Sequence, residues 1–170
     1  MKISNNNPFT KTIKTVHFLF RDSTPFSLSE VLKNSSSGLE FSEDYLKVSV
    51  LPENVRIASG PKEGKSGASW SHRIALHINE QNEEIRKMLD SYDNGLVIPC
   101  LETTGGTIHV YGNRNQPLSF SYKDVESPDN IQLIGHEIIV KGDTYHSYKV
   151  INTVDFYSPS RLASWLATSL

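Results

Sequence analysis

Residues 79–122 have the sequence NEQNEEIRKMLDSYDNGLVIPCLETTGGTIHVYGNRNQPLSFSY, in which an amphipathic helix runs directly into a series of short strands. The apolar residues of the helical part recur at i, i+3, i+4 and i+7, a spacing that places them on one face. They are Ile85, Met88, Leu89 and Tyr92. Asn79 is a suitable N-cap, and Asp93-Asn94-Gly95 supplies a left-handed stop. The stretch therefore predicts one well-bounded helix on a β-rich scaffold.

The strands that follow this helix are separated by short turns. Residues 96–101 predict a strand, Thr104-Gly105-Gly106 a turn, and residues 107–111 the returning strand, while residues 117–122 alternate with period two. Further strands are predicted over residues 12–20, 45–51, 55–58, 70–78, 131–140, 144–150 and 153–157. The strand over residues 12–20 has unequal sides, as in a half-buried strand.

The predicted fold is mainly β of the α+β type, a β-sandwich or barrel-like module. It carries one flanking helix, an N-terminal arm over residues 1–10 and a short C-terminal helix over residues 159–170. The chain has 170 residues, of which 37% are hydrophobic, and this is enough for one core. We therefore expect a single domain.

Two segments, GLVIPCLETTGGTIHVYGNRNQPLSFSY (residues 95–122) and LIGHEIIVKGDTYHSYKV (residues 133–150), carry a resemblance to a known group. Their order of strands, glycine turns and a Pro-Leu strand resembles small structural proteins of phages and prophages of Bacteroides-type bacteria, with a plan similar to tail-tube and tail-connector folds. The resemblance covers roughly residues 68–156 and assigns no role to single residues. It implies a non-enzymatic virion protein of the tail or neck (a tube, ring or connector), made in the bacterial cytoplasm, that joins copies of itself and other virion proteins.

Such a module joins its neighbours through strand edges, long hairpin loops and terminal extensions, because these expose unpaired backbone groups. The N-terminal arm, residues 1–10, is one candidate. A second is a mobile hairpin loop over residues 60–69, and its expected interface residues are Gly60, Pro61, Lys62, Glu63, Gly64, Lys65 and Ser66. The third is the C-terminal helix, whose apolar face comprises Leu162, Trp165, Leu166 and Leu170. A helix this short is marginal alone in water, so it docks either on its own sheet or on a neighbouring subunit.

Composition excludes several classes of protein. The net charge of −2 argues against a protein that coats nucleic acid through clustered basic residues, although passive passage of DNA through a lumen stays open. No segment approaches the roughly 18 apolar residues of a membrane span. A single cysteine, Cys100, forbids an intramolecular disulfide, and its place in an apolar strand predicts a buried thiol.

Motifs for catalysis, nucleotides and metals are incomplete. The glycines at Gly60 and Gly64 have three residues between them, whereas a phosphate-binding loop requires four and a following helix. The six histidines lack the HExxH spacing, and no Gly-x-Ser-x-Gly elbow is present. We therefore expect no catalytic, metal or cofactor residues. A metal-dependent hydrolase requires His and Asp residues to converge in space, as His136 and His146 would if they faced each other across a turn at residues 141–143.

A monomeric β-sandwich that binds carbohydrate or another small ligand is the alternative function. Its stacking platforms would be Trp70, Tyr111 and Tyr122, and its polar contacts Asn113, Arg114 and Asn115. Aromatic residues beside polar loops suit sugar recognition, but they suit a sandwich core equally well.

Overall fold

The structure is a computed structural model that describes residues 13–21, 39–41, 45–65, 67–78, 83–125 and 135–152. Its strands are β1 (Ile13–Phe20), β2 (Leu39–Phe41), β3 (Tyr45–Ser49), β4 (Val55–Gly64), β5 (Gly67–Ile78), β6 (Leu96–Thr103), β7 (Thr107–Val110), β8 (Leu118–Val125), β9 (Gly135–Thr144) and β10 (Lys149–Asn152). A short 3-10 helix, η2 (Pro52–Asn54), precedes β4, and the α-helix α2 (Glu83–Tyr92) lies between β5 and β6. The fold is mainly β, as the sequence predicts.

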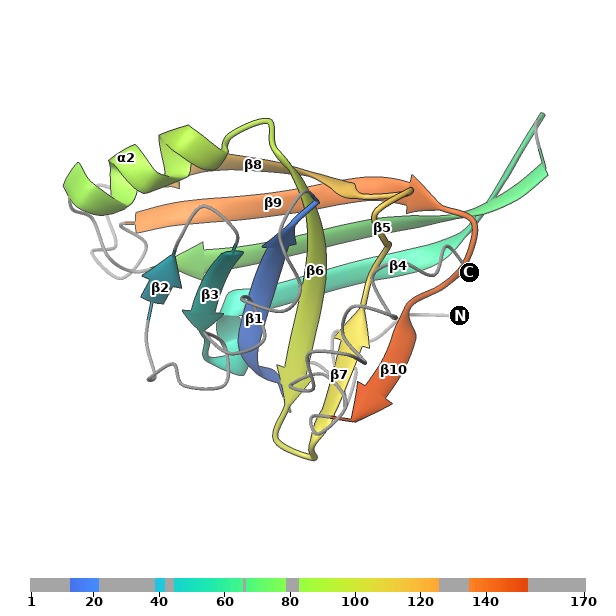
Figure 1. The fold of residues 1–170 in the computed structure, drawn as a ribbon, viewed down its shortest axis with the longest axis horizontal. Helices are drawn as coiled ribbons and strands as arrows, with labels where there is room; N and C mark the ends of the chain where they lie inside the picture. The colour runs from blue at the N-terminus through green and yellow to red at the C-terminus, as the bar shows by residue number, and fades with distance from the viewer. Residues whose placement is uncertain are drawn as a thin grey trace.

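All the described strands belong to one antiparallel sheet that does not close into a barrel. Its path runs β2-β3-β1-β6-β8-β9-β5-β4, and β7 pairs with both β6 and β10. β6 is the junction, because one edge pairs with β1 while the other pairs with β8 at Leu96 and Val97 and with β7 from Cys100 to Glu102. In Figure 1 the strands β4, β5, β8 and β9 run across the view, and β1, β6 and β7 cross them steeply. The sheet thus bends into two layers that pack at a steep angle.

The main core lies between these two layers. Phe18 of β1 and Phe120 of β8 make an edge-to-face ring contact at 5.6 Å, and both side chains are at most 1% exposed. Helix α2 lies beside β8 (Figure 1) and contributes Ile85, Met88, Leu89 and Tyr92, which are all buried. These are the four residues predicted from the helical spacing, so the predicted helix and its apolar face are confirmed.

The end of α2 also follows the sequence prediction. Asn94 has a positive φ of 63°, which is the left-handed conformation that stops helices. The Gly95 N–H donates to the carbonyl of Tyr92 at 2.9 Å. A Cβ on Gly95 would lie 2.8 Å from that carbonyl oxygen, so glycine is required for close approach.

Two predictions about strands are wrong. β1 is buried on both faces, because Val16 and Phe18 pack into the main core while His17 and Leu19 are equally buried on the opposite face. β9 continues through residues 141–143, where a turn was expected. Gly142 is a strand residue there, and a Cβ at this position would lie 3.2 to 3.6 Å from atoms of Leu118. The glycine therefore serves close packing, and residues 145–148 connect β9 to β10 instead.

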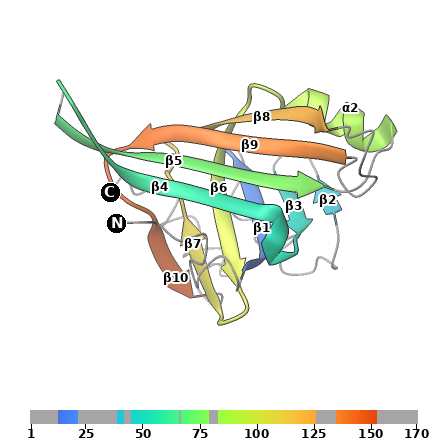
Figure 2. The same cartoon turned by 180° about the vertical axis from the view of Figure 1, so that it is seen from behind.

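The predicted hairpin over residues 60–69 is present, but the prediction that these residues form a loop is wrong, because β4 continues to Gly64 and β5 begins at Gly67. The two strands stay in register from Val55↔Leu76 to Gly64↔Gly67. β9 accompanies β5 only as far as Trp70↔Thr144. We name residues 61–70 the hairpin arm. Beyond the pair Pro61↔Trp70 at its base, the described residues 62–65 and 67–69 extend past β9 as a two-stranded ribbon, which projects from the body in both views (Figures 1 and 2).

Candidate functional site

The base of the hairpin arm holds a chain of hydrogen bonds through His72. On β4, Ser59 lies opposite His72 of β5, and the Ser59 Oγ lies 2.7 Å from His72 Nδ1. His72 Nε2 lies 2.8 Å from the Thr144 Oγ1 on β9. The Thr144 hydroxyl in turn donates to the backbone carbonyl of His146. Three strands thus bring one connected network together at the point where the arm leaves the body.

The direction of these hydrogen bonds fixes the tautomer of His72. The single proton of the Thr144 hydroxyl is used on the carbonyl of His146, so Thr144 Oγ1 accepts from His72 Nε2–H. Nδ1 then carries the lone pair and accepts the hydroxyl proton of Ser59. Burial lowers the pKa of His72, which favours this neutral form. We name Ser59, His72 and Thr144 the serine relay.

Exposure divides the serine relay into two parts. His72 is 1% exposed and Thr144 is 4% exposed, whereas Ser59 is exposed to solvent. The hydroxyl at the solvent end is therefore held by a buried base, which is held in turn by a buried hydroxyl. This order of groups is the one by which proteins polarise a serine hydroxyl.

Aromatic rings extend the network towards β7. The ring of Tyr111 lies 5.3 Å from that of His72, edge to face, and 5.4 Å from that of Tyr148. Tyr148 stacks on His109 with ring centroids 4.7 Å apart. Burial raises the pKa of Tyr111 and lowers that of His109. These rings pack the base of the arm against the β7–β10 pair.

A depression beside this cluster has a volume of about 10 Å³ and is lined by Gly112, Asn113, Gln116, Thr144, His146 and Lys149 among others. A depression of this size has room for about one water molecule. The side chain of Asn113 accepts from the N–H groups of Asn115 and Gln116 at 2.8 and 3.0 Å. The Asn113 side chain therefore stabilises the turn in which it lies.

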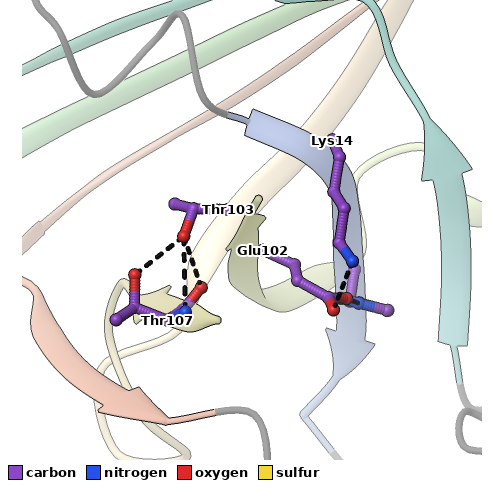
Figure 3. Close-up of polar contacts among 5 residues, drawn as sticks. Lys14, Glu102, Thr103 and Thr107 are labelled. Atoms are coloured by element: carbon purple, nitrogen blue, oxygen red, sulfur yellow. Dashed lines mark hydrogen bonds and ion pairs between the residues drawn. The ribbon is translucent and has the colours of Figure 1, made fainter. Parts of the chain in front are cut away.

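A second polar cluster lies on the opposite face of β1. His17 Nε2 lies 3.1 Å from Glu102 Oε2, and Lys14 Nζ lies 3.4 Å from Glu102 Oε1 (Figure 3 shows the Lys14 contact). Lys47, the strand partner of His17, is 7% exposed. Burial lowers the pKa of His17, and Glu102 opposes this effect. Glu102 thus contacts the buried His17 through one carboxylate oxygen and the half-exposed Lys14 through the other.

The same face contains a second hydrophobic cluster of Leu19, Tyr45, Ile98, Cys100, Ile108, Val110 and Ile151. Cys100 is 1% exposed, and burial raises the pKa of its thiol, so the predicted buried thiol is confirmed. At the edge of this face Thr103 and Thr107 bond to each other (Figure 3), with Oγ1 atoms 2.8 Å apart across the β6–β7 turn.

The two histidines whose convergence a metal-dependent hydrolase would require do not converge. His136 lies near the start of β9 and bonds to Asp124 Oδ1 at 2.8 Å, whereas His146 follows the end of the same strand. Eight residues of strand separate His136 from Thr144, a span of about 26 Å. Within the described ranges, no three His, Cys, Asp or Glu side chains gather as metal ligands.

The predicted sugar platforms are also divided. Tyr111 is 1% exposed in the core. Trp70 pairs with Thr144 while Tyr122 pairs with Ile138, six residues earlier on β9 and about 20 Å away. Tyr122 donates its hydroxyl to Asp90 of α2, which raises the pKa of Tyr122 to about 12. The three rings therefore form no common surface.

Of the predicted interface residues, Gly60 to Gly64 lie in β4 and Lys65 in the following turn, and those from Pro61 to Lys65 are exposed. Ser66 lies outside the described residues. So do the N-terminal arm and the C-terminal residues Leu162, Trp165, Leu166 and Leu170. Among the described helices, none is long and apolar enough to cross a membrane.

No protein-family model, curated protein or solved structure matches this chain. The resemblance to phage tail proteins therefore stays a prediction.

Proposed function

We propose that the chain is a structural protein of a bacteriophage tail or neck, which joins copies of itself through the hairpin arm. The observation that carries this proposal is the projection of the arm beyond β9 (Figure 2). All described residues of the arm between Pro61 and Ala68 are exposed. A two-stranded ribbon without a covered face is marginally stable by itself, so a second surface that covers it would stabilise it.

The edge of β4 supports the same proposal. β4, a strand of ten residues, ends the path of described strands and pairs with β5 alone among them, so its other edge has no partner among the described strands. Pro61 and Lys62 lie in this edge, and both residue types limit strand addition. The inner half of β4 is therefore suited to backbone pairing, and the arm to contacts through its side chains.

The ligand-binding alternative has weaker support. The depression near Asn113 has a volume of about 10 Å³, whereas pockets for small ligands are typically about 300 Å³ or more. The core position of Tyr111 removes a stacking platform. Neither the described depression nor Tyr111 therefore supports the ligand-binding alternative.

Shortening the arm tests the proposal. Gly60 and Ser71 are strand partners, so replacing residues 61–70 by an Asn-Gly turn keeps the register of the remaining hairpin. We expect native mass spectrometry to show an oligomer for the wild-type chain and a folded monomer for the shortened one. A wild-type chain that stays monomeric at every concentration, or a shortened chain that still associates, overturns the proposal.

A further inference from the structure

We propose that Ser59 is a nucleophile that accepts acyl groups from aryl esters of small carboxylic acids, with His72 as its base and Thr144 as the residue that positions the base. The proposal goes beyond a structural role and does not depend on it. It rests on the geometry of the serine relay, in which the hydroxyl of the exposed residue Ser59 donates to the Nδ1 of the buried His72 at 2.7 Å.

The hydrogen bonds give each group a separate task. A serine hydroxyl is a weak nucleophile unless a neighbouring base takes its proton as it attacks. His72 Nδ1 faces the hydroxyl, and Thr144 fixes the imidazole by accepting from Nε2 at 2.8 Å. The carbonyl of His146 prevents the Thr144 hydroxyl from donating to His72 instead. Thr144 therefore acts through His72 and holds the tautomer in which Nδ1 is free to take a proton.

The reaction balances without any further co-reactant except water. Ser59 Oγ forms a bond to the ester carbonyl carbon while its proton passes to His72 Nδ1. The bond from the carbonyl carbon to the alcohol oxygen then breaks, and the alcohol leaves with that proton. Water hydrolyses the resulting acyl-serine by the same path, releasing the acid and restoring the hydroxyl.

The neighbouring pair on the hairpin indicates the substrate class. Residues two apart on a strand share a face, so Pro61 and Trp70, which are partners, lie beside Ser59 and His72 on the same side. Pro61 is exposed and Trp70 is partly exposed, so two apolar side chains lie next to the nucleophile on this side of the hairpin. Such side chains suit an aromatic ring. The open face accepts a small ester but encloses little of it, so we expect weak binding and slow turnover.

The proposal assigns the stabilisation of the developing negative charge to backbone N–H groups on the outer edge of β4. Among the described strands β4 has no neighbour on its outer edge, so alternate backbone N–H groups of β4 point away from β5. Backbone N–H groups of this kind stabilise an oxyanion when they lie near the reacting carbonyl.

Acetylation by p-nitrophenyl acetate tests the proposal on the full chain. Peptide mass spectrometry should locate the acetyl group on Ser59, and p-nitrophenol should be released in an initial burst. Ser71 is the internal control, because it is exposed on the adjacent strand and is not part of the relay. Ser59→Ala should abolish the burst, and His72→Gln should slow acetylation of Ser59 on the order of 100-fold. Circular dichroism establishes that each variant is folded.

Substitutions of Thr144 distinguish a residue that positions His72 from one that only stabilises the fold. Thr144→Ser keeps the hydroxyl and should keep the acetylation rate, whereas Thr144→Val should lower it and change its pH profile because the tautomer of His72 is no longer held. The wild-type rate should be maintained at about pH 6.5, where an unperturbed imidazole is half protonated. Equal acetylation of Ser59 and Ser71, acetylation confined to lysines, or a rate unaffected by His72→Gln overturns the proposal.

Discussion

The two strands of the β4–β5 hairpin are paired without interruption from a buried inner end to a solvent-exposed outer end. At the inner end, Val55 and its partner Leu76 are 4% and 1% exposed and belong to the main core. At the outer end, Glu63 and its partner Ala68 are both exposed. The backbone pairing is the same at both ends, so the difference in exposure comes from the elements that cover each end. The body stabilises the fold, and the arm is available for recognition.

Large core substitutions should show this difference most strongly. Phe120 is 1% exposed and contacts the rings of Phe18 and Tyr92, so Phe120→Ala should lower the free energy of unfolding by about 3–5 kcal/mol. Trp70→Ala, in the partly exposed arm, should cost less than half as much. Urea denaturation with matched m-values measures both. Equal losses would show that the arm is part of the cooperative core.

Acidification should destabilise the body of the protein but not the hairpin arm. His17, His72 and His109 have pKa values lowered by burial, whereas histidines in the unfolded chain titrate near pH 6.5. As the pH falls below about 6.5 the unfolded state binds more protons, so stability is lost; above that pH the contribution is fully present. We expect a lower urea midpoint at about pH 5.5 than at about pH 7.5.

The arm contributes none of these three histidines, and this gives the control for the acidification experiment. The chain with residues 61–70 replaced should keep the same pH dependence, and His72→Gln should make it shallower. A midpoint that rises on acidification would contradict the assignment of neutral buried imidazoles.

The sequence predicts the body of the protein better than it predicts the hairpin arm. Helix α2 and the strands β6, β7 and β8 follow from local signals, because Ile85, Met88, Leu89 and Tyr92 and the Thr104-Gly105-Gly106 turn lie within a few residues of what they determine. The arm does not follow, because its glycines and Pro61 are typical of loops, and the register with β5 that makes it a strand is set outside it. Burial on the far side of β1 has the same non-local origin.

The sequence does not predict the serine relay, because its three residues lie far apart in the chain. His72 occupies a position in the alternating apolar series of Trp70, Ile74 and Leu76, and a polar residue on an apolar face is a signal that the sequence contains. Its partners Ser59 and Thr144 are 13 and 72 residues away. They become visible only when the pairing of β4 and β9 with β5 is known.

Removal of the buried thiol should have a smaller effect than the loss of an aromatic ring. Cys100 packs among Leu19, Ile98 and Ile108, so Cys100→Ala should cost about 1 kcal/mol and change no assembly behaviour. The native protein should resist thiol reagents, because the thiol is buried and its pKa is raised. Rapid labelling of the folded protein would contradict this burial. It would show that Cys100 is accessible to solvent, as the residues of the hairpin arm are.

The smallest effect on stability, and the sharpest test of the comparison, comes from two matched ion pairs. Lys62 of the arm binds Asp143 at 3.2 Å, and Lys123 of the body binds Glu137 at 3.0 Å, with lysine side chains 59% and 62% exposed. Exposed pairs contribute little, so Lys62→Ala and Lys123→Ala should each change the free energy of unfolding by about 0.5 kcal/mol or less. Association should respond differently, because Lys62 lies in the proposed contact surface and Lys123 does not. We therefore expect Lys62→Ala, and not Lys123→Ala, to weaken the oligomer in native mass spectrometry. If both variants associate like the wild type, the contact surface does not include the side chain of Lys62; if Lys123→Ala alone dissociates, the body and not the arm joins the subunits.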